Sequence, residues 1–266
     1  VFGPPKPPVD RLAEEKEILA YIRQKNGRIS ALDLVELMGW DFARAEEEAT
    51  RLLVNYGGEP EVTDDGVVVY AFKEIRKTAA PGQPEPSVPR AWERLESKPP
   101  LTGNATGTNV AIGLFNGFNL LAPFWIVPAF EAQMAERFVG QEFLLHDYPL
   151  LFSSMLFAVP LGRWVVEKFR DRGRKKRNAR KRLLQRVLVR RGQAAPQEAL
   201  APDAELAQAL DKELVALGGD IETDANGQVL YSFPRVREEF AAMEKARAQA
   251  STRERNPGAI VFSSKD

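Results

Sequence analysis

The chain has 266 residues, enough for one or two domains, and its 37 Lys and Arg residues balance its 37 Asp and Glu residues. It contains no cysteine and one histidine, His146, which excludes disulfides, thiolate metal ligands and any catalytic relay or metal site that needs two histidines. The zero net charge gives no reason to expect a nucleic-acid-binding protein or an acidic tail from the chain as a whole.

The first polar segment, residues 10–77, predicts three helices followed by two strands. The spacing of apolar residues favours a helix over 14–24 and another over 42–55. Between them, Ser30 and Asp33 have the spacing of a capping box, which predicts the start of a further helix at Ser30. This segment is therefore expected to form a compact domain.

A second polar segment, residues 181–240, repeats the first. The sequence GGEPEVTDDGVVVYAFKEIR at 57–76 aligns with GGDIETDANGQVLYSFPRVR at 218–237 without a gap. Asp65-Gly66 is typical of a tight two-residue hairpin turn, and Val68, Tyr70 and Phe72 alternate along the strand that follows it. Such similarity indicates a duplication and predicts the same domain twice.

Three helices followed by a β-hairpin resemble the winged-helix fold, and the residues GRISALDLVELMG at 27–39 carry this resemblance best. The resemblance implies two winged-helix-like domains in tandem. The repeated pattern that ends in G-x-V-x-Y-x-F is also similar to that of uncharacterised bacterial and plastid membrane proteins, a likeness that implies no known chemistry.

A long apolar region, residues 105–166, separates the two polar segments. No charged residue lies between Lys98 and Glu131, and the stretch 106–130 has the length of about 20 residues that a bilayer-spanning helix requires. A second charge-free stretch, 148–162, continues past Arg163 into further apolar residues. The region predicts a two-helix transmembrane hairpin, and the alternative is a hairpin buried in the core of a large soluble protein.

The distribution of charge predicts the orientation of this hairpin. Fourteen Lys or Arg and two acidic residues lie in 163–191, whereas 131–147 contains four acidic residues and one arginine. The positive-inside rule places the first of these stretches, and with it both polar segments, on the cytosolic side of an integral membrane protein with two spans. The basic residues next to the second span are expected to contact anionic lipid headgroups, and they are Arg163, Lys168, Arg170, Arg172, Arg174, Lys175, Lys176 and Arg177.

Four polar or small residues share one face of the first predicted span: Asn109, Gly113, Asn116 and Gly117. The two glycines form a GxxxG motif, which allows a second helix to approach closely, and asparagines can hydrogen-bond across such a contact. This face is either an interface with a partner subunit or the surface on which the chain's own second span packs.

Nucleic-acid binding is disfavoured because the helix that would enter the major groove is acidic. In the first copy it contains Glu46, Glu47 and Glu48 in succession, and residues 10–77 have fifteen acidic and ten basic residues. The corresponding helix of the second copy, PDAELAQALDKELVALGG, is acidic as well. Protein partners are therefore the better expectation for these helices.

No sequence motif for catalysis was found. The chain lacks a phosphate-binding P-loop, a dinucleotide fingerprint, HExxH, CxxC and GxSxG. We therefore expect no enzyme activity, no catalytic residue, no cofactor and no metal site.

The remaining segments complete the predicted plan of the chain. Residues 1–9 are a Pro-rich N-terminal segment without the apolar core of a signal peptide, and 78–104 are a Pro-rich extended linker. Residues 167–180 form a basic juxtamembrane stalk, with a break considered at Gly173. Residues 241–266 contain the rest of a charged helix that starts at Phe240, followed by a tail with a short strand candidate at 259–262.

These expectations combine into one hypothesis. The fold class is α+β, with two winged-helix-like domains flanking a two-helix transmembrane hairpin. The expected function is that of a non-enzymatic membrane scaffold that binds membrane lipids and either protein partners or copies of itself. The alternatives are a membrane-tethered DNA-binding regulator and an accessory subunit of a transport or energy-conversion complex.

Overall fold

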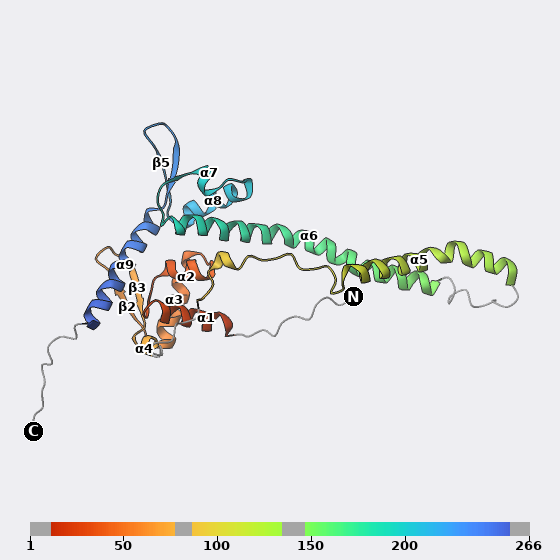
Figure 1. Ribbon diagram of the computed structural model, residues 1–266, viewed down its shortest axis with the longest axis horizontal. Helices are drawn as coiled ribbons and strands as arrows, with labels where there is room; N and C mark the ends of the chain where they lie inside the picture. The colour runs from red at the N-terminus through yellow and green to blue at the C-terminus, as the bar shows by residue number, and fades with distance from the viewer. Residues whose placement is uncertain (1–11, 78–86, 135–146, 256–266) are drawn as a thin grey trace, which may run out of the picture. The chain divides into compact units, whose positions relative to one another are not determined.

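The computed structural model describes residues 12–77, 87–134 and 147–255 (Figure 1), and its fold is α+β. The chain divides into two compact units. One, the helical unit, contains Ser97–Arg174; the other, the mixed unit, joins Asp10–Glu96 with Lys175–Asp266. The two polar segments of the sequence thus fold together in the mixed unit.

The first half of the mixed unit contains a three-stranded antiparallel sheet with strand order β1-β3-β2. Helices precede, interrupt and follow the strands. The elements are α1 (Ala13–Gln24), β1 (Arg28–Ile29), α2 (Ala31–Met38), α3 (Phe42–Tyr56), β2 (Glu59–Val62), β3 (Val68–Ala71), α4 (Lys73–Lys77) and the 3-10 turn η1 (Ala91–Glu93).

The second half has the same succession of helix, strand, helix, helix, strand, strand and helix, and its sheet has the equivalent order β4-β6-β5. In both halves the residue after the last strand donates its amide hydrogen to a glycine carbonyl, Phe72 to Gly27 and Phe233 to Gly192. The elements are the last part of α6 (Tyr148–Val189), β4 (Ala195–Pro196), α7 (Gln197–Leu200), α8 (Ala204–Ala216), β5 (Asp220–Thr223), β6 (Val229–Ser232) and α9 (Pro234–Arg255).

Local capping signals account for the helix boundaries in the first half. The capping box between Ser30 and Asp33 is present, so the predicted start of α2 is confirmed. α2 ends at Gly39 and α3 ends at Gly57, each with the left-handed backbone that glycine adopts without steric cost. The predicted helices 14–24 and 42–55 correspond to α1 and α3 within one residue at each end.

The hairpin turns are longer than predicted. β2 ends at Val62 and β3 begins at Val68, and the amide of Thr63 donates to the carbonyl of Val67 across the loop. The tight two-residue turn expected at Asp65-Gly66 is therefore wrong. Gly66 instead takes a φ of +78° at the end of a three-residue turn, the other common hairpin that requires a left-handed residue.

One hydrophobic core extends through both halves of the mixed unit. It includes Ile22, Leu34 and Leu52 from the first half and Leu183 and Leu210 from the second, all almost completely buried. Every residue of α2 from Ala31 to Leu37 is buried, including its two carboxylates. The two polar segments are therefore packed against one another through α2.

Part of the expected linker belongs to this core. Ala91 and Trp92 are buried, and Arg90 forms an ion pair with Glu36 of α2 at 2.8 Å. Glu96 accepts two hydrogen bonds from the Arg177 guanidinium. The expectation of an extended linker is wrong for these residues. Burial of the large aromatic side chain of Trp92 stabilises their packing against the core.

In the helical unit, α5 (Thr106–Met134) is followed by the first part of α6. Within the described ranges, α6 is the one helix long and apolar enough to cross a membrane. α5 contains three asparagines and two internal prolines, Pro123 and Pro128. Helical conformation continues through Gly173, where a break had been considered.

Three sequence expectations fall outside the residues that the structure describes. These are the Pro-rich segment 1–9, most of the connection between the two predicted spans, 135–146, and the strand candidate at 259–262. The charged helix expected from Phe240 is present as α9 and begins six residues earlier, at Pro234.

Candidate functional site

The last helix, α9, covers the sheet of the first half. In Figure 1, α9 (blue) lies beside β2 and β3 (orange), and Arg28 donates to the carbonyl of Ala246 at 3.2 Å. Val69 and Ala71 are buried in addition to Tyr70, so β3 is buried on both faces. Of the alternating residues predicted along this strand, Tyr70 and Phe72 are buried and Val68 is exposed, and Val69 and Ala71 on the outer face are buried as well because a helix from the other half covers it.

Two side chains of α9 hold the N-terminal end of α2. Glu239, buried at 6% exposure, accepts a hydrogen bond from the amide of Leu32 at 2.8 Å. Arg247 donates to the carboxylate of Asp33 at 2.5 Å and to the backbone carbonyl of Arg28. The amides of Leu32 and Asp33 in the first turn of α2 thus have acceptors, one from α9 and one from the capping box of α2 itself.

α6 holds the opposite end of α2. Arg180 donates to the backbone carbonyls of Gly39 and Trp40, and its Nε forms an ion pair with Glu213 of α8 at 2.6 Å. Arg180 had been placed in a juxtamembrane stalk from its neighbours in sequence. The structure places it in the mixed unit as a partly buried side chain that joins α2 to α8.

Burial changes the ionisation of two carboxyl groups at this junction. Burial raises the pKa of Glu239, and the hydrogen bond from Leu32 opposes that rise in part. Burial likewise raises the pKa of Glu36, against the opposing effect of Arg90. Glu239 joins α9 to α2 of the other half, whereas Glu36 pairs with Arg90 of its own half.

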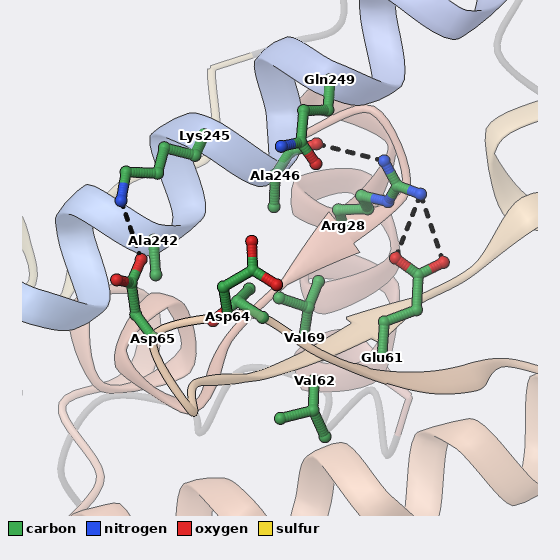
Figure 2. Close-up of a pocket in the computed structure, with 11 residues that line it drawn as sticks. Arg28, Glu61, Val62, Asp64, Asp65, Val69, Ala242, Lys245, Ala246 and Gln249 are labelled. Atoms are coloured by element: carbon green, nitrogen blue, oxygen red, sulfur yellow. Dashed lines mark hydrogen bonds and ion pairs between the residues drawn. The ribbon is translucent and has the colours of Figure 1, made fainter.

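A small polar pocket lies between the first hairpin and α9 (Figure 2). Its volume is about 130 Å³, and its charged groups are largely paired, Arg28 with Glu61 and Lys245 with Asp65. The carboxylate of Asp64 points into the space between these pairs in Figure 2. Binding sites for drug-sized molecules are larger, about 300–1,000 Å³, so this pocket does not suit such a ligand.

Among the described residues that line this pocket there is no histidine, cysteine, serine or tyrosine, and its lysine and arginine are in ion pairs. In the described part of the chain, no group of three or more His, Cys, Asp or Glu side chains could hold a metal ion.

The acidic third helices use part of their charge inside the mixed unit. Glu46 of α3 pairs with Arg235 of α9 at 2.8 Å, and Glu205 of α8 pairs with Lys175 at 3.5 Å. Glu47 of α3 remains exposed. The helix that would read DNA in a winged-helix protein is therefore acidic and also partly engaged with the other half.

The predicted face of α5 is brought together in the structure only in part. Asn109, Gly113 and Asn116 line one cleft of the helical unit, and Gly117 lies a turn beyond Gly113. A Cβ atom added at either glycine would meet no atom within 4 Å. Among the described residues, nothing therefore packs closely on the GxxxG motif, α6 included.

The asparagines of this face are satisfied locally. Asn109 donates to the Thr102 hydroxyl at 2.8 Å and contacts Asn104, while Asn116 donates to the carbonyl of Ile112 in the preceding turn at 2.9 Å. Asn116 is only 5% exposed. These side chains do not require a partner helix to complete their hydrogen bonds.

Three of the eight predicted lipid-binding cations have carboxylate partners. Arg174 is enclosed by Glu167 and Asp171 on its own helix. Lys175 pairs with Glu205, as described above, and Arg177 pairs with Glu96 at 2.7 Å. These pairs reduce the charge that these three residues can offer to lipid headgroups.

The other five cations are more available. The Lys168 ammonium lies 5.2 Å from the centre of the Trp164 ring, and Arg163 donates to the backbone carbonyl of Leu101 at 3.3 Å. Arg170, Arg172 and Lys176 are exposed. Sequence spacing could not separate these two groups, because the acidic partners of Lys175 and Arg177 lie far away in the sequence.

Comparison of the chain with known proteins identified no relative: no protein-family model, no curated protein and no solved structure matches it.

Proposed function

We propose that this chain is a non-enzymatic scaffold of the membrane, anchored by two transmembrane spans with both polar halves on the cytosolic side. The polar halves are two winged-helix-like domains that arose by duplication. They present surfaces to protein partners or to further copies of the chain, within an oligomer or a larger membrane complex.

The proposal of two spans rests on one observation, that both polar halves fold into one unit. Residues before and after the apolar region share one core and are joined by buried contacts such as that between Leu32 and Glu239. Segments on opposite sides of a bilayer cannot share a core, so the chain between them crosses an even number of times. If α6 crosses the membrane, α5 must cross as well.

The surface of the helical unit supports its insertion into lipid. In the described part of the helical unit, large apolar side chains are exposed on α5 from Val110 to Trp125 and on α6 from Tyr148 to Phe169, among them Leu114, Phe115, Leu151 and Met155, each more than 60% exposed. Soluble proteins rarely expose contiguous apolar surface of this kind. In a bilayer the same side chains face acyl chains, and the helices satisfy their own backbone hydrogen bonds.

The order of elements supports the winged-helix resemblance. Each half has a helix, a short strand, two helices and a two-stranded hairpin, and the short strand pairs with the second strand of the hairpin. Since fold alone does not determine function, the choice of partner depends on the surface. The acidic α3, with Glu46 paired to Arg235, favours a protein partner over nucleic acid.

The open GxxxG motif supports assembly within the membrane. Gly113 and Gly117 leave space on α5 that a helix of a partner or of a second copy can fill. Native mass spectrometry on the full chain, extracted from its own membrane in mild detergent, tests this. We expect a homo-oligomer of defined size.

Two variants locate the interface. Gly117→Leu places a bulky side chain on the proposed contact and should release the partner. Gly162→Leu is the control, since it makes the same change on α6, where there is also space for the side chain.

A wild-type chain that is monomeric and without other subunits in this experiment contradicts the scaffold. A fixed ratio of foreign subunits instead of copies points to the accessory-subunit alternative. Salt-dependent binding of duplex DNA by the full chain would favour the regulator alternative.

A further inference from the structure

A cleft opens in the helical unit between the first turns of α5 and the middle of α6. Its volume is about 520 Å³, within the range of about 300–1,000 Å³ that is typical of small-molecule sites. Among the described residues, its walls come from 100–116 and 156–163. It is four times the volume of the polar pocket beside α9.

One end of the cleft is polar. Its rim contains the amides of Asn104 and Asn109, the hydroxyl of Thr102 and the guanidinium of Arg163. Arg163 is the one charged residue among the described residues that line the cleft, and no carboxylate accompanies it. A guanidinium has five N–H donors, and the hydrogen bond to the carbonyl of Leu101 uses one of them.

The other end of the cleft is apolar. Ile112 of α5 lies one turn beyond Asn109, and on α6 Pro160 and then Phe157 and Leu156 lie one and two turns from Arg163. Ile112 and Phe157 are more than a third exposed, so both present apolar surface that the chain itself leaves uncovered. Along α6 the lining thus changes from polar to apolar, whereas on α5 Asn116 lies one turn beyond Ile112 and donates its amide hydrogen to the Ile112 carbonyl.

The position of Arg163 in the sequence matches this gradient. It is the first charged residue after the charge-free stretch 148–162, and the basic segment of α6 follows it. In a membrane this is the level of the headgroups, where an arginine can extend its guanidinium to the interface. A ligand of the cleft would thus have its charged part at the headgroup level and its apolar part in the hydrocarbon region.

We propose that this cleft binds one anionic lipid. The phosphate of its headgroup pairs with Arg163 and accepts hydrogen bonds from the neighbouring amides, while an acyl chain lies along Ile112, Phe157 and Pro160. An arginine without a carboxylate partner suits a phosphate, to which it can donate two parallel hydrogen bonds. The inference rests on the proposed function, since the cleft meets lipid only if α5 and α6 lie in the membrane.

The test is native mass spectrometry of the full chain in mild detergent, titrated with phosphatidylglycerol or with phosphatidylcholine of the same acyl chains. The wild-type chain should bind one phosphatidylglycerol with clear preference. Arg163→Gln should lower that affinity about tenfold, the order of one charge-assisted hydrogen bond, and should leave phosphatidylcholine binding unchanged. Arg182→Gln is the matched control, because it removes the same charge from an exposed position that lies outside the cleft and outside the predicted lipid-contact residues.

A second pair of variants tests the apolar wall. Gly113→Leu directs a side chain into the cleft without meeting other atoms and should abolish binding of the lipid, whereas Gly117→Leu changes the same helix outside the cleft and should retain it. The inference is overturned if Arg163→Gln and Arg182→Gln weaken binding equally, if Gly113→Leu binds like the wild type, or if inorganic phosphate alone binds as tightly as the lipid.

Failure of this inference can be distinguished from failure of the proposed function. If alkaline carbonate releases the chain from its membrane, the proposed insertion is wrong and the lipid site is wrong with it. If the chain resists extraction and retains its partners while Arg163→Gln leaves lipid binding unchanged, only the lipid site is wrong.

Discussion

Replacing Glu239 with alanine should loosen α2 without unfolding the rest of the mixed unit. Glu239 accepts the hydrogen bond of the Leu32 amide at 2.8 Å, and both residues are buried. A buried amide that loses its acceptor costs about 1–3 kcal/mol. Since 1.36 kcal/mol is a factor of ten in an equilibrium constant, the equilibrium constant for opening the first turn of α2 should rise roughly 5- to 150-fold.

Hydrogen–deuterium exchange on the full chain in detergent measures this opening, because exchange of backbone amides reports the free energy of local unfolding. The peptide that contains Ala31–Met38 should exchange faster in Glu239→Ala. Glu239→Gln retains an acceptor oxygen and should exchange close to the wild-type rate, and Glu238→Ala changes an exposed neighbour and serves as the control. Equal exchange in Glu239→Ala and Glu238→Ala would refute the reasoning.

Three further predictions concern the same unit. Gly192→Ala should lower the free energy of unfolding in urea by much more than Gly227→Ala. Both glycines have a left-handed backbone, but only a Cβ atom at 192 would meet a carbonyl oxygen, that of Phe233 at 2.5 Å. Equal urea midpoints for the two variants would contradict this. The raised pKa of Glu239 implies that the folded state binds its proton more readily, so the stability that this proton contributes is fully present below the unfolded value of about 4.3 and is lost as pH rises through the folded pKa. The wild-type chain should thus gain stability relative to Glu239→Gln on acidification from pH 7 to 5, and a constant difference would refute the assignment. Arg180→Met should lower the free energy of unfolding by about 2 kcal/mol or more, because it leaves the buried carboxylate of Glu213 unpaired. Arg182→Met, at an exposed position, should change it little, and equal losses would contradict the contacts assigned to Arg180.

Local signals predicted most of the elements of the mixed unit. The capping box at Ser30, the glycines after α2 and α3 and the apolar periodicity of α1 act over a few residues, so one sequence is sufficient to recognise them. The turn between β2 and β3 was predicted in the right place with the wrong length, because a left-handed glycine such as Gly66 is required by both kinds of turn.

The contacts that join the two halves could not be predicted in this way. Leu32 and Glu239 are 207 positions apart, and Arg28 and the carbonyl of Ala246 are 218 apart. Each of these residues taken alone is an ordinary helix or strand residue, and nothing in its neighbourhood identifies a distant partner. Trp92 in the Pro-rich stretch was the one local signal of docking, since a large aromatic side chain is out of place in a solvated linker.

The sequence predicted the α5 side of the candidate cleft but not its α6 side. The shared face of Asn109, Gly113 and Asn116 follows from helical spacing, and the structure places all three on one cleft. The contribution of Arg163 does not follow from spacing, because it depends on the pairing of two helices that run in opposite directions past each other. Sequence alone therefore predicted a packing face, whereas the structure adds a charged rim to it.

The central claim is that the chain crosses the membrane twice and keeps both polar halves on one side. Because it contains no cysteine, a single introduced cysteine reports only on its own position. Glu47→Cys on α3 and Asp211→Cys on α8 are exposed positions in the two halves, and Gln141→Cys lies in the connection between the spans. The measurement is labelling in intact cells with a maleimide that cannot cross membranes. We predict that Gln141→Cys reacts at once and that the other two react only after permeabilisation. Labelling of Glu47→Cys and Asp211→Cys from opposite sides, or of all three from the same side, would contradict the account.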